Sequence, residues 1–418
     1  MRPILDGMLL DGILRRFVQV GRLAVTWPDG STTTYAGQPG PQAQVLLRDA
    51  ATVRRLARNP ALAVGECYMD GGFAPQGCSI YDVLEVLQVN AADNRPRHAV
   101  LALRGWLGYL KRKAVQFNPA PRARRNVAHH YDLNGRLYSL FLDRDRQYSC
   151  AYFPRGDETL DEAQAAKKRH IAAKLRLTRP DLEVLDIGCG WGGMALTLAR
   201  DFGARVTGIT LSTEQLAEAQ ARAAAEGLAD RVTFELMDYR AMRRPFDRIV
   251  SVGMFEHVGV VHYQAFFDMV RRCLAPDGVA LLHSIGRSDG PGFTNPWIAK
   301  YIFPGGYTPA LSEVFPAIEK SGLVATDVEI LRLHYAETLR HWRWRFAANR
   351  DAIETIYDER FCRMFEFYLA GSELSFRQPG GMVFQIQLVR EKSAVPLTRD
   401  YMVDTERFAA EKVRTAAR

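Results

Sequence analysis

The chain lacks an apolar run long enough to cross a bilayer, because no stretch reaches the ~18 residues that a membrane-spanning helix needs. Its first residues carry Asp6 and Asp11 within their apolar pattern, so they lack the uninterrupted core of a signal peptide. We therefore expect any contact with a membrane to be peripheral, on the surface of the bilayer. The six cysteines include no C-x-x-C pair, which argues against a disulfide framework or a metal site and fits a reducing cytoplasm.

Acidic residues are missing from one long stretch, residues 95–125, which holds nine lysines and arginines. Such a stretch suits an anionic surface, either a membrane or a nucleic acid, or forms a solvated linker. Over the whole chain the balance is 55 basic against 47 acidic residues, a moderate net charge of +8. Hydrophobic residues make up 47% and charged residues 24% of the 418 positions, which excludes a disordered chain, a collagen and a coiled-coil rod.

An amphipathic helix is expected near the start, because apolar residues recur at helical spacing over residues 4–18. We expect this helix to pack on its own domain. Residues 21–47 predict short strands separated by turns, and residues 48–59 predict a helix that ends before Pro60. Residues 1–90 are therefore interpreted as a small α+β domain, in which no titratable cluster suggests catalysis.

From about residue 126 the chain alternates between strand and helix patterns. Alternation of this kind predicts βαβ units and a parallel sheet with both faces covered. The expected fold class is α/β, a doubly wound, mostly parallel sheet with the smaller N-terminal α+β domain. The expected strands are residues 182–187, 204–209, 232–236, 246–252 and 278–283, and the expected helices are residues 160–177, 192–201, 213–226 and 262–273.

A Gly-rich turn at residues 184–193, VLDIGCGWGG, is the sharpest local signal. An apolar strand runs into glycines that let a ligand approach the backbone, and a helix start then offers free N–H groups. The spacing is neither the dinucleotide G-x-G-x-x-G nor a phosphate loop. Asp186 would repel a pyrophosphate and suits a cofactor that carries an ammonium and hydroxyls. A purely structural turn is the alternative.

The turn resembles the first motif of the class I S-adenosylmethionine-dependent methyltransferases. In that fold the end of the second strand holds the cofactor's ribose. The acidic residue usual there is absent, so polar contacts would come from the segment GITLSTEQ at residues 208–215. Asp238 would accept a bond from the adenine amine, and Tyr239 would pack on the ring. The cofactor-binding residues that the resemblance implies are Tyr148, Ser149, Asp186, Gly188, Gly190, Gly192, Thr210, Ser212, Gln215, Asp238 and Tyr239.

Further strings resemble the cyclopropane-fatty-acyl-phospholipid synthases and their mycolic-acid-modifying relatives. They are YSCAYF at 148–153, FEHVG at 255–259, LHSIG at 282–286, WIAKYIFPGG at 297–306, YAETLRHW at 335–342 and PLTRDY at 396–401. The resemblance covers about residues 126–402, and the motif GECYMDG at 65–71 is more loosely similar to the lipid-binding domain of the bacterial enzymes. One departure is HYDLNGR at 130–136, which lacks the family's Gly-Asn-Asp order.

The chain is expected to divide into four parts. The residue patterns predict a small α+β domain at residues 1–90 and a basic linker at 91–125, and the resemblance adds a lipid-binding interpretation of the first domain, the S-adenosylmethionine-dependent methyltransferase domain at 126–390 and a tail at 391–418.

The placement of Glu256 and His283 can be argued from the strand pattern. Glu256 follows the fourth expected strand and His283 ends the fifth, and the carboxyl ends of strands in such a sheet line the ligand crevice. We therefore expect both side chains to face the cofactor.

The resemblance implies transfer of a methyl group to a cis double bond of an acyl chain, with bound bicarbonate as the general base. The implied holders of bicarbonate are Cys150, Glu256, His283, Ile285 and Tyr335. Aromatic faces can stabilise the intermediate carbocation. The candidates for that contact are Tyr152, Phe153, Tyr301, Phe303 and Tyr335.

The expected substrate is a membrane phospholipid with an unsaturated acyl chain, and the expected product carries a cyclopropane ring. Simple methylation that gives methyl-branched chains is the first alternative, and a non-catalytic lipid-binding protein is the second. We expect an enzyme at the inner face of the membrane, in peripheral contact with its anionic surface through residues 95–125. No nucleic acid is expected, since no N/D-P-P-Y/F motif follows the fourth strand, and homodimer formation is left open.

Overall fold

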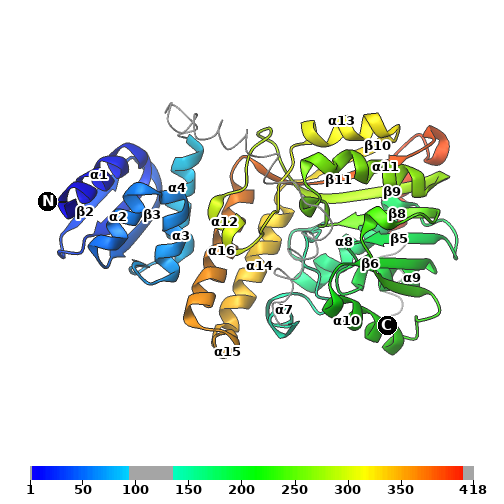
Figure 1. The fold of residues 1–418 in the computed structure, drawn as a ribbon, viewed down its shortest axis with the longest axis horizontal. Coiled ribbons are helices and arrows are strands. Elements are labelled where there is room, and N and C mark those ends of the chain that lie inside the picture. The colour runs from blue at the N-terminus through cyan, green and yellow to red at the C-terminus, as the bar shows by residue number, and fades with distance from the viewer. Residues whose placement is uncertain (1, 94–134, 408–418) are drawn as a thin grey trace. The chain divides into compact units, whose positions relative to one another are not determined.

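Residues 2–93 and 135–407 are described by a computed structural model, and they divide into two units (Figure 1). Among them the first unit contains residues 2–93, 293–304 and 339–381, and the second contains the remainder. The predicted basic linker lies outside the described residues, apart from its first positions at 91–93. Within the two described ranges, no helix is long and apolar enough to span a membrane.

The first unit begins with the predicted helix and strands. It contains α1 (Arg2–Phe17), β1 (Val20–Thr26), β2 (Thr32–Ala36), β3 (Gln38–Leu47), α2 (Ala50–Arg58), α3 (Pro60–Met69), β4 (Phe73–Pro75) and α4 (Ile80–Asp93). Their sheet has the order β2-β1-β3-β4. α2 ends before Pro60 as predicted, and this proline starts α3, where a missing N–H costs nothing.

Two later segments join the first unit, although the sequence analysis assigns them to the domain at residues 126–390. They hold α12 (Pro296–Tyr301), most of α14 (His334–Ala348), α15 (Arg350–Ile356) and α16 (Glu359–Arg377). Tyr68 donates to Glu366 of α16 at 3.0 Å, and Lys300 of α12 pairs with Glu66 at 2.7 Å. The partners lie more than 230 residues apart, so no local pattern could predict the pairing.

The second unit is the predicted doubly wound sheet. Its strands are β5 (Glu183–Ile187), β6 (Arg205–Thr210), β7 (Val232–Leu236), β8 (Phe246–Val252), β9 (Leu274–Arg287), β10 (Val324–Leu331) and β11 (Gly381–Val389). The strand order is β10-β11-β9-β8-β5-β6-β7. The pairs from β9 through β7 are parallel, whereas β10 and β11 are antiparallel. The expected fold class is thus confirmed, and β9 is longer at both ends than the predicted strand.

Helices cover both faces of this sheet, as the alternating pattern predicted. The covering helices are α8 (Leu160–Leu175), α9 (Gly193–Phe202), α10 (Thr213–Ala225), α11 (Tyr263–Cys273) and α13 (Leu311–Ser321). The unit also contains α7 (Gly135–Phe141) and the short 3-10 turns η1 (Tyr239–Ala241), η2 (Phe255–His257), η3 (Val260–His262) and η4 (Lys392–Ala394). One core cluster joins the strands to α8, α9 and α10, and another joins them to α11 and α13. The carboxyl ends of the parallel strands remain available for a ligand.

Candidate active site

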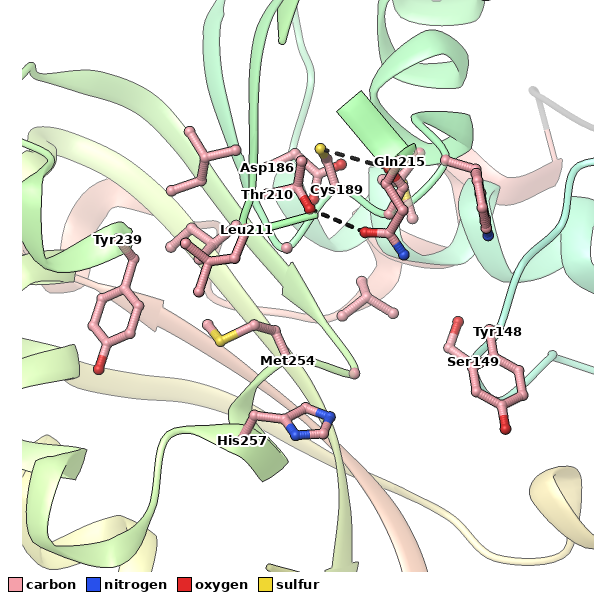
Figure 2. A pocket seen from close by; sticks show the side chains of 18 of the residues that line it. Tyr148, Ser149, Asp186, Cys189, Thr210, Leu211, Gln215, Tyr239, Met254 and His257 are labelled. Atoms are coloured by element: carbon pink, nitrogen blue, oxygen red, sulfur yellow. Dashed lines mark hydrogen bonds between the residues drawn. The ribbon is translucent and has the colours of Figure 1, made fainter. Parts of the chain in front are cut away.

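A pocket opens at the carboxyl ends of β5, β6 and β8, where the Gly-rich turn lies (Figure 2). Gly188, Gly190 and Gly192 all have positive φ angles, of +80°, +54° and +84°. A Cβ atom built on Gly190 would meet nothing within 4 Å, so the backbone leaves space for a ligand there. Most of the predicted cofactor residues line this pocket: Tyr148, Ser149, Asp186, Gly188, Gly190, Thr210, Gln215, Asp238 and Tyr239.

Asp186 places a buried carboxylate at the end of β5. Its side chain is 2% exposed, and among the described residues its Oδ2 atom has no hydrogen-bond partner. Burial raises the pKa of this carboxyl to about 7, and the nearby Lys167 charge opposes that shift. An unpaired buried oxygen of this kind is satisfied by a ligand that brings a donor.

Tyr239 lies on the side of the pocket opposite Tyr148 and Ser149 (Figure 2), and Asp238, which precedes it in the chain, also lines the pocket. Asp238 Oδ1 accepts from the backbone and side chain of Arg240, both at 3.0 Å. Its Oδ2 atom has no partner within the part of the chain that is described. This oxygen is therefore available to an amine of a bound ligand.

The segment after β6 places its polar side chains in two different roles. The Thr210 hydroxyl donates to Gln215 Oε1 at 3.0 Å, which leaves the amide N–H groups of Gln215 available as donors. Ser212 instead accepts from the Gln215 N–H at 3.2 Å and caps α10. Gly192 caps α9, and a Cβ there would lie 2.7 Å from Phe234. Ser212 and Gly192 do not line the pocket. They are the N-terminal caps of α10 and α9.

His283 was expected to end its strand, but β9 continues past it to Arg287. His283 pairs with Val252 at the end of β8, and its carbonyl accepts from the N–H of Gly253 of the pocket wall at 3.0 Å. Glu256 follows β8 in η2, and neither Glu256 nor His283 is among the residues that line the pocket. Glu256 Oε1 accepts from the Ile285 N–H at 2.6 Å, and Oε2 has no partner among the described residues. Burial raises the pKa of Glu256 to about 7. Burial holds the pKa of His283 well below its usual range, so its imidazole is neutral.

Cys150 and Tyr335 lie beside one residue, Thr338. The Ala151 N–H donates to the Thr338 hydroxyl at 3.0 Å, and Tyr335 precedes Thr338 by one turn in α14. Cys150 is fully buried, and burial raises the pKa of its thiol, so the thiolate needed for nucleophilic attack is disfavoured. Glu256 is thus joined to Ile285 by a hydrogen bond, whereas Cys150 and Tyr335 share Thr338 as a neighbour.

The aromatic candidates for the carbocation lie in both units. Tyr301 and Phe303 belong to the first unit. Tyr152 of the second unit stacks on His170 and on His334, with distances between ring centroids of 4.1 Å and 4.9 Å. Phe153 also stacks on His334, so both of these rings already have aromatic neighbours.

Sequence reasoning missed Lys167, Gln147, Met254 and His257. Gln147, Met254 and His257 line the pocket, and Lys167 of α8 donates to Gln147 Oε1 at 2.7 Å. Burial lowers the pKa of His257 to about 4, so this pocket residue is neutral. His257 lies in the string FEHVG and could have been found there. Nothing in the sequence separates Lys167 from its neighbour Lys168, because their contacts depend on tertiary packing.

The residues present fit S-adenosylmethionine. Asp186 and Asp238 each have one buried carboxylate oxygen without a partner among the described residues, which suits a cofactor that carries N–H and O–H donors, and the backbone at Gly190 leaves open space for it. This pocket, at the switch point of a seven-stranded sheet with this order, defines a class I S-adenosylmethionine-dependent methyltransferase.

Comparison with known proteins identifies the family. Residues 119–386 match the model of the mycolic acid cyclopropane synthetase family, and the chain belongs to that family. Residues 10–95 match a domain of unknown function, DUF7884.

Individual relatives agree with this assignment. The chain is 39% identical over 352 residues to the cyclopropane-fatty-acyl-phospholipid synthase of Escherichia coli K12, covering 83% of this chain and 88% of the relative. It is 35% identical over 381 residues to a probable fatty acid methyltransferase of Pseudomonas putida, covering 87% and 92%. The crystal structure of the mycolic acid cyclopropane synthase CmaA1 complexed with SAH and CTAB matches with a TM-score of 0.61 and 35% identity, covering 65% of this chain and 99% of that chain.

Proposed function

We propose that this enzyme transfers the methyl group of S-adenosylmethionine to a cis double bond of a phospholipid acyl chain and closes a cyclopropane ring. The observation that carries the proposal is the buried Glu256 carboxylate, which has one oxygen held by Ile285 and one unpaired oxygen, and which directly precedes the pocket residue His257 in the chain. The similarity to the Escherichia coli synthase supports the phospholipid substrate.

The pocket residues serve the methyl transfer by holding the donor in a dry environment. When bound, S-adenosylmethionine supplies an electrophilic methyl group on its sulfonium. An alkene is a weak nucleophile, so orientation and exclusion of water must provide much of the rate enhancement. His257 is neutral and Met254 is uncharged, so neither repels a sulfonium at this side of the pocket.

Ring closure requires removal of one proton from the added methyl group. A charged side-chain base would be costly against an apolar acyl chain, so bound bicarbonate is proposed as the base. The unpaired Glu256 oxygen would accept the bicarbonate O–H. Gln385 Nε2 donates to His283 Nδ1 at 3.1 Å, so the neutral imidazole carries its proton on Nε2 and can donate to the anion.

The remaining proposed holders orient this anion site. The Tyr335 hydroxyl and the backbone at Cys150 are the further donors in the proposal. Ile285 is one of the implied holders of bicarbonate, but in the structure its N–H donates to Glu256 Oε1. Ile285 thereby aims the carboxylate, and Cys150 has no covalent role.

Variants at this site test the proposed base. Glu256→Gln keeps an acceptor for Ile285 but loses the charge, and we expect turnover to fall about 100-fold or more with little change in cofactor affinity. Glu313→Gln is the matched control, because Glu313 accepts from the Ala310 N–H at 3.0 Å and does not line the pocket. Cys150→Ser should keep substantial activity. Near-normal turnover by Glu256→Gln would contradict the mechanism.

Bicarbonate itself can be removed. Turnover in degassed, carbonate-free buffer should fall and should recover when bicarbonate is added. Full activity of carbonate-free enzyme would exclude an external base.

Methyl branching is the second candidate function, and the similarity to the Pseudomonas putida methyltransferase favours it. The same carbocation can lose a proton from the chain instead of the added methyl group, which leaves a methyl-branched chain that keeps a double bond. Expression in cells, followed by NMR of the extracted lipids, separates the products, since this unsaturated branched chain and the cyclopropane have the same mass. Branched chains without cyclopropanes would overturn ring closure and leave the methyltransferase assignment intact.

Peripheral contact with an anionic membrane is also proposed, because the acyl chain has to be drawn from a bilayer. The basic stretch 95–125 is the first candidate by composition, although it lies outside the described residues. α1 supplies a second apolar surface, here called the α1 face, formed by Leu5, Met8, Leu9 and Ile13. These side chains are 37–69% exposed and follow helical spacing, whereas Leu10 on the other side is buried in its unit.

A further inference from the structure

Lys167 is a buried ammonium that contacts two pocket residues. Its exposure is 0%, and its Nζ atom donates to Gln147 Oε1 at 2.7 Å and to Ser149 Oγ at 2.8 Å. Both acceptors are neutral oxygens. Buried lysines normally pair with a carboxylate, because an uncompensated charge is costly to desolvate. Among the described residues, no carboxylate lies within ion-pair distance of Lys167, although Asp143, Asp145 and Asp186 are near enough to act on its charge.

Neighbouring cations differ from Lys167 in this respect. On the same helix, Lys168 pairs with Asp145 and Lys174 pairs with Glu329. In the pocket wall, Arg146 pairs with Glu218 and Arg240 pairs with Asp238. Each of these four cations is therefore compensated by a carboxylate that it contacts, whereas Lys167 contacts only neutral oxygens.

The hydrogen bond to Ser149 also sets the direction of the serine hydroxyl. An ammonium can only donate, so Ser149 Oγ must accept from Lys167 and has its own proton left to donate elsewhere. Figure 2 shows Ser149 on the side of the pocket opposite Tyr239. Gln147 is held in the same way: its Oε1 accepts from Lys167 and its Nε2 donates to Asp145 at 3.1 Å.

We propose that Lys167 is a positioning residue that makes the Ser149 hydroxyl a donor to the carboxylate of S-adenosylmethionine. The cofactor carries one carboxylate and one ammonium besides its adenosine. The unpaired Asp186 oxygen suits the ammonium, and the end at Asp238 suits the adenine. The carboxylate then belongs where positive charge and a free hydroxyl proton meet, at Ser149. The inference rests on the cofactor site proposed above.

The test compares two ligands that differ only in the carboxylate. S-adenosylhomocysteine and its decarboxylated analogue are titrated by calorimetry into the full chain and into Lys167→Met. We expect Lys167→Met to bind S-adenosylhomocysteine about tenfold more weakly, the loss of one charge-assisted hydrogen bond, and to bind the decarboxylated analogue within about twofold of wild type. Ser149→Ala should show the same selective loss, and the double variant should lose no more than either single variant.

Lys174→Met is the control for loss of a buried ammonium from α8, and it should leave the preference for the carboxylate unchanged. If Lys167→Met does not fold, Lys167→Arg and Ser149→Ala still decide the case, since the arginine keeps the charge and should keep the preference. Equal weakening of both ligands, or no weakening of either, would overturn the proposal. Failure of the wild type to bind S-adenosylhomocysteine would instead overturn the cofactor site.

Discussion

Two buried carboxylates, Asp186 and Glu256, show how single residues prepare this site. Each has one oxygen without a hydrogen-bond partner in the described structure, and burial raises the pKa of each to about 7. An unsatisfied buried polar group costs about 1–3 kcal/mol. A ligand that donates a hydrogen bond removes that cost. The unpaired oxygens of Asp186 and Glu256 therefore lower the stability of the ligand-free fold at the two positions where we expect a ligand to donate a hydrogen bond.

The raised pKa of Glu256 predicts a pH-dependent loss of stability. The ionised form is favoured in the unfolded chain from about pH 4.5, whereas the folded protein keeps the proton until about pH 7. The contribution of Glu256 to stability is therefore fully present below pH 4.5 and is lost as the pH rises through 7. The free energy of unfolding of wild type minus that of Glu256→Gln should fall by roughly 3 kcal/mol over this window.

Chemical denaturation in carbonate-free buffer measures that difference. Glu162→Gln is the control of opposite sign, because hydrogen bonds from Thr159 lower the pKa of Glu162. Its carboxylate stabilises the fold above its unfolded pKa, and that contribution is lost as the pH falls. A difference for Glu256→Gln that is flat from pH 4.5 to 8 would contradict the assigned burial.

We expect the variant Gly190→Val to fold but not to bind the cofactor. Gly190→Val fills the open space over the turn and should abolish binding of S-adenosylhomocysteine. Its φ of +54° adds strain of about 1–2 kcal/mol for a residue with a side chain. Gly227→Val is the matched control, because Gly227 has a φ of +66°, open space around it and a place outside the pocket. Calorimetry with unchanged affinity in folded Gly190→Val would exclude the turn from the site.

At the scale of elements, α8 supports the pocket and the sheet together. Thr159 and Glu162 form a capping box at its start, and Arg176 ends it with a left-handed φ of 55°. Lys167 faces the pocket residue Ser149, whereas Lys174 and His170 bind Glu329 of β10. One helix thus holds a residue of the pocket wall and a residue of the edge strand β10 through hydrogen bonds and ion pairs.

The capping box predicts a measurable effect on stability. Thr159→Ala removes the side-chain acceptor for the Glu162 N–H and should lower the free energy of unfolding by about 1 kcal/mol. Thr159→Ser keeps the hydroxyl and should lie close to wild type. Urea denaturation of the two variants makes the comparison, and equal stability would show that the cap contributes nothing to α8.

At the scale of the molecule, neither unit is one continuous piece of chain. After β9 the chain enters the first unit at residues 293–304, returns, and enters it again at residues 339–381. The helices of these segments contribute Ala370 and Leu374 to the core of the first unit. A fragment that ends near residue 90 would therefore lack part of its own core.

The α1 face and the basic stretch predict a salt-dependent attachment to membranes. Replacing Met8 and Leu9 with Ser, or Lys111, Arg112 and Lys113 with Glu, should reduce co-sedimentation with anionic vesicles and leave affinity for S-adenosylhomocysteine unchanged. Each basic residue near such a surface contributes about 1 kcal/mol, which salt screens. Leu397→Ser is the control, because that side chain is fully exposed in the second unit. Binding equal to wild type in both sets would remove these segments from membrane docking.

The alternation of strands and helices, the Gly-rich turn, and the positions of Asp186 near the end of β5 and of Glu256 after β8 were all predictable from the sequence. These features follow from residue periods and turn chemistry, which act over a few neighbouring residues. The prediction that His283 ends its strand was wrong, because β9 continues to Arg287. The sequence did not determine that Ser212 caps a helix instead of lining the pocket, because Ser serves both roles with the same hydroxyl.

Which distant groups meet became known from the tertiary fold alone. It joined Lys167 to Ser149, Glu256 to the Ile285 N–H and Tyr68 to Glu366, pairs separated by 18, 29 and 298 residues. No local period encodes such contacts, since each depends on the path of the chain between the partners. Lys167 contacts the pocket residue Ser149 because the path of the chain between them brings α8 against the pocket wall.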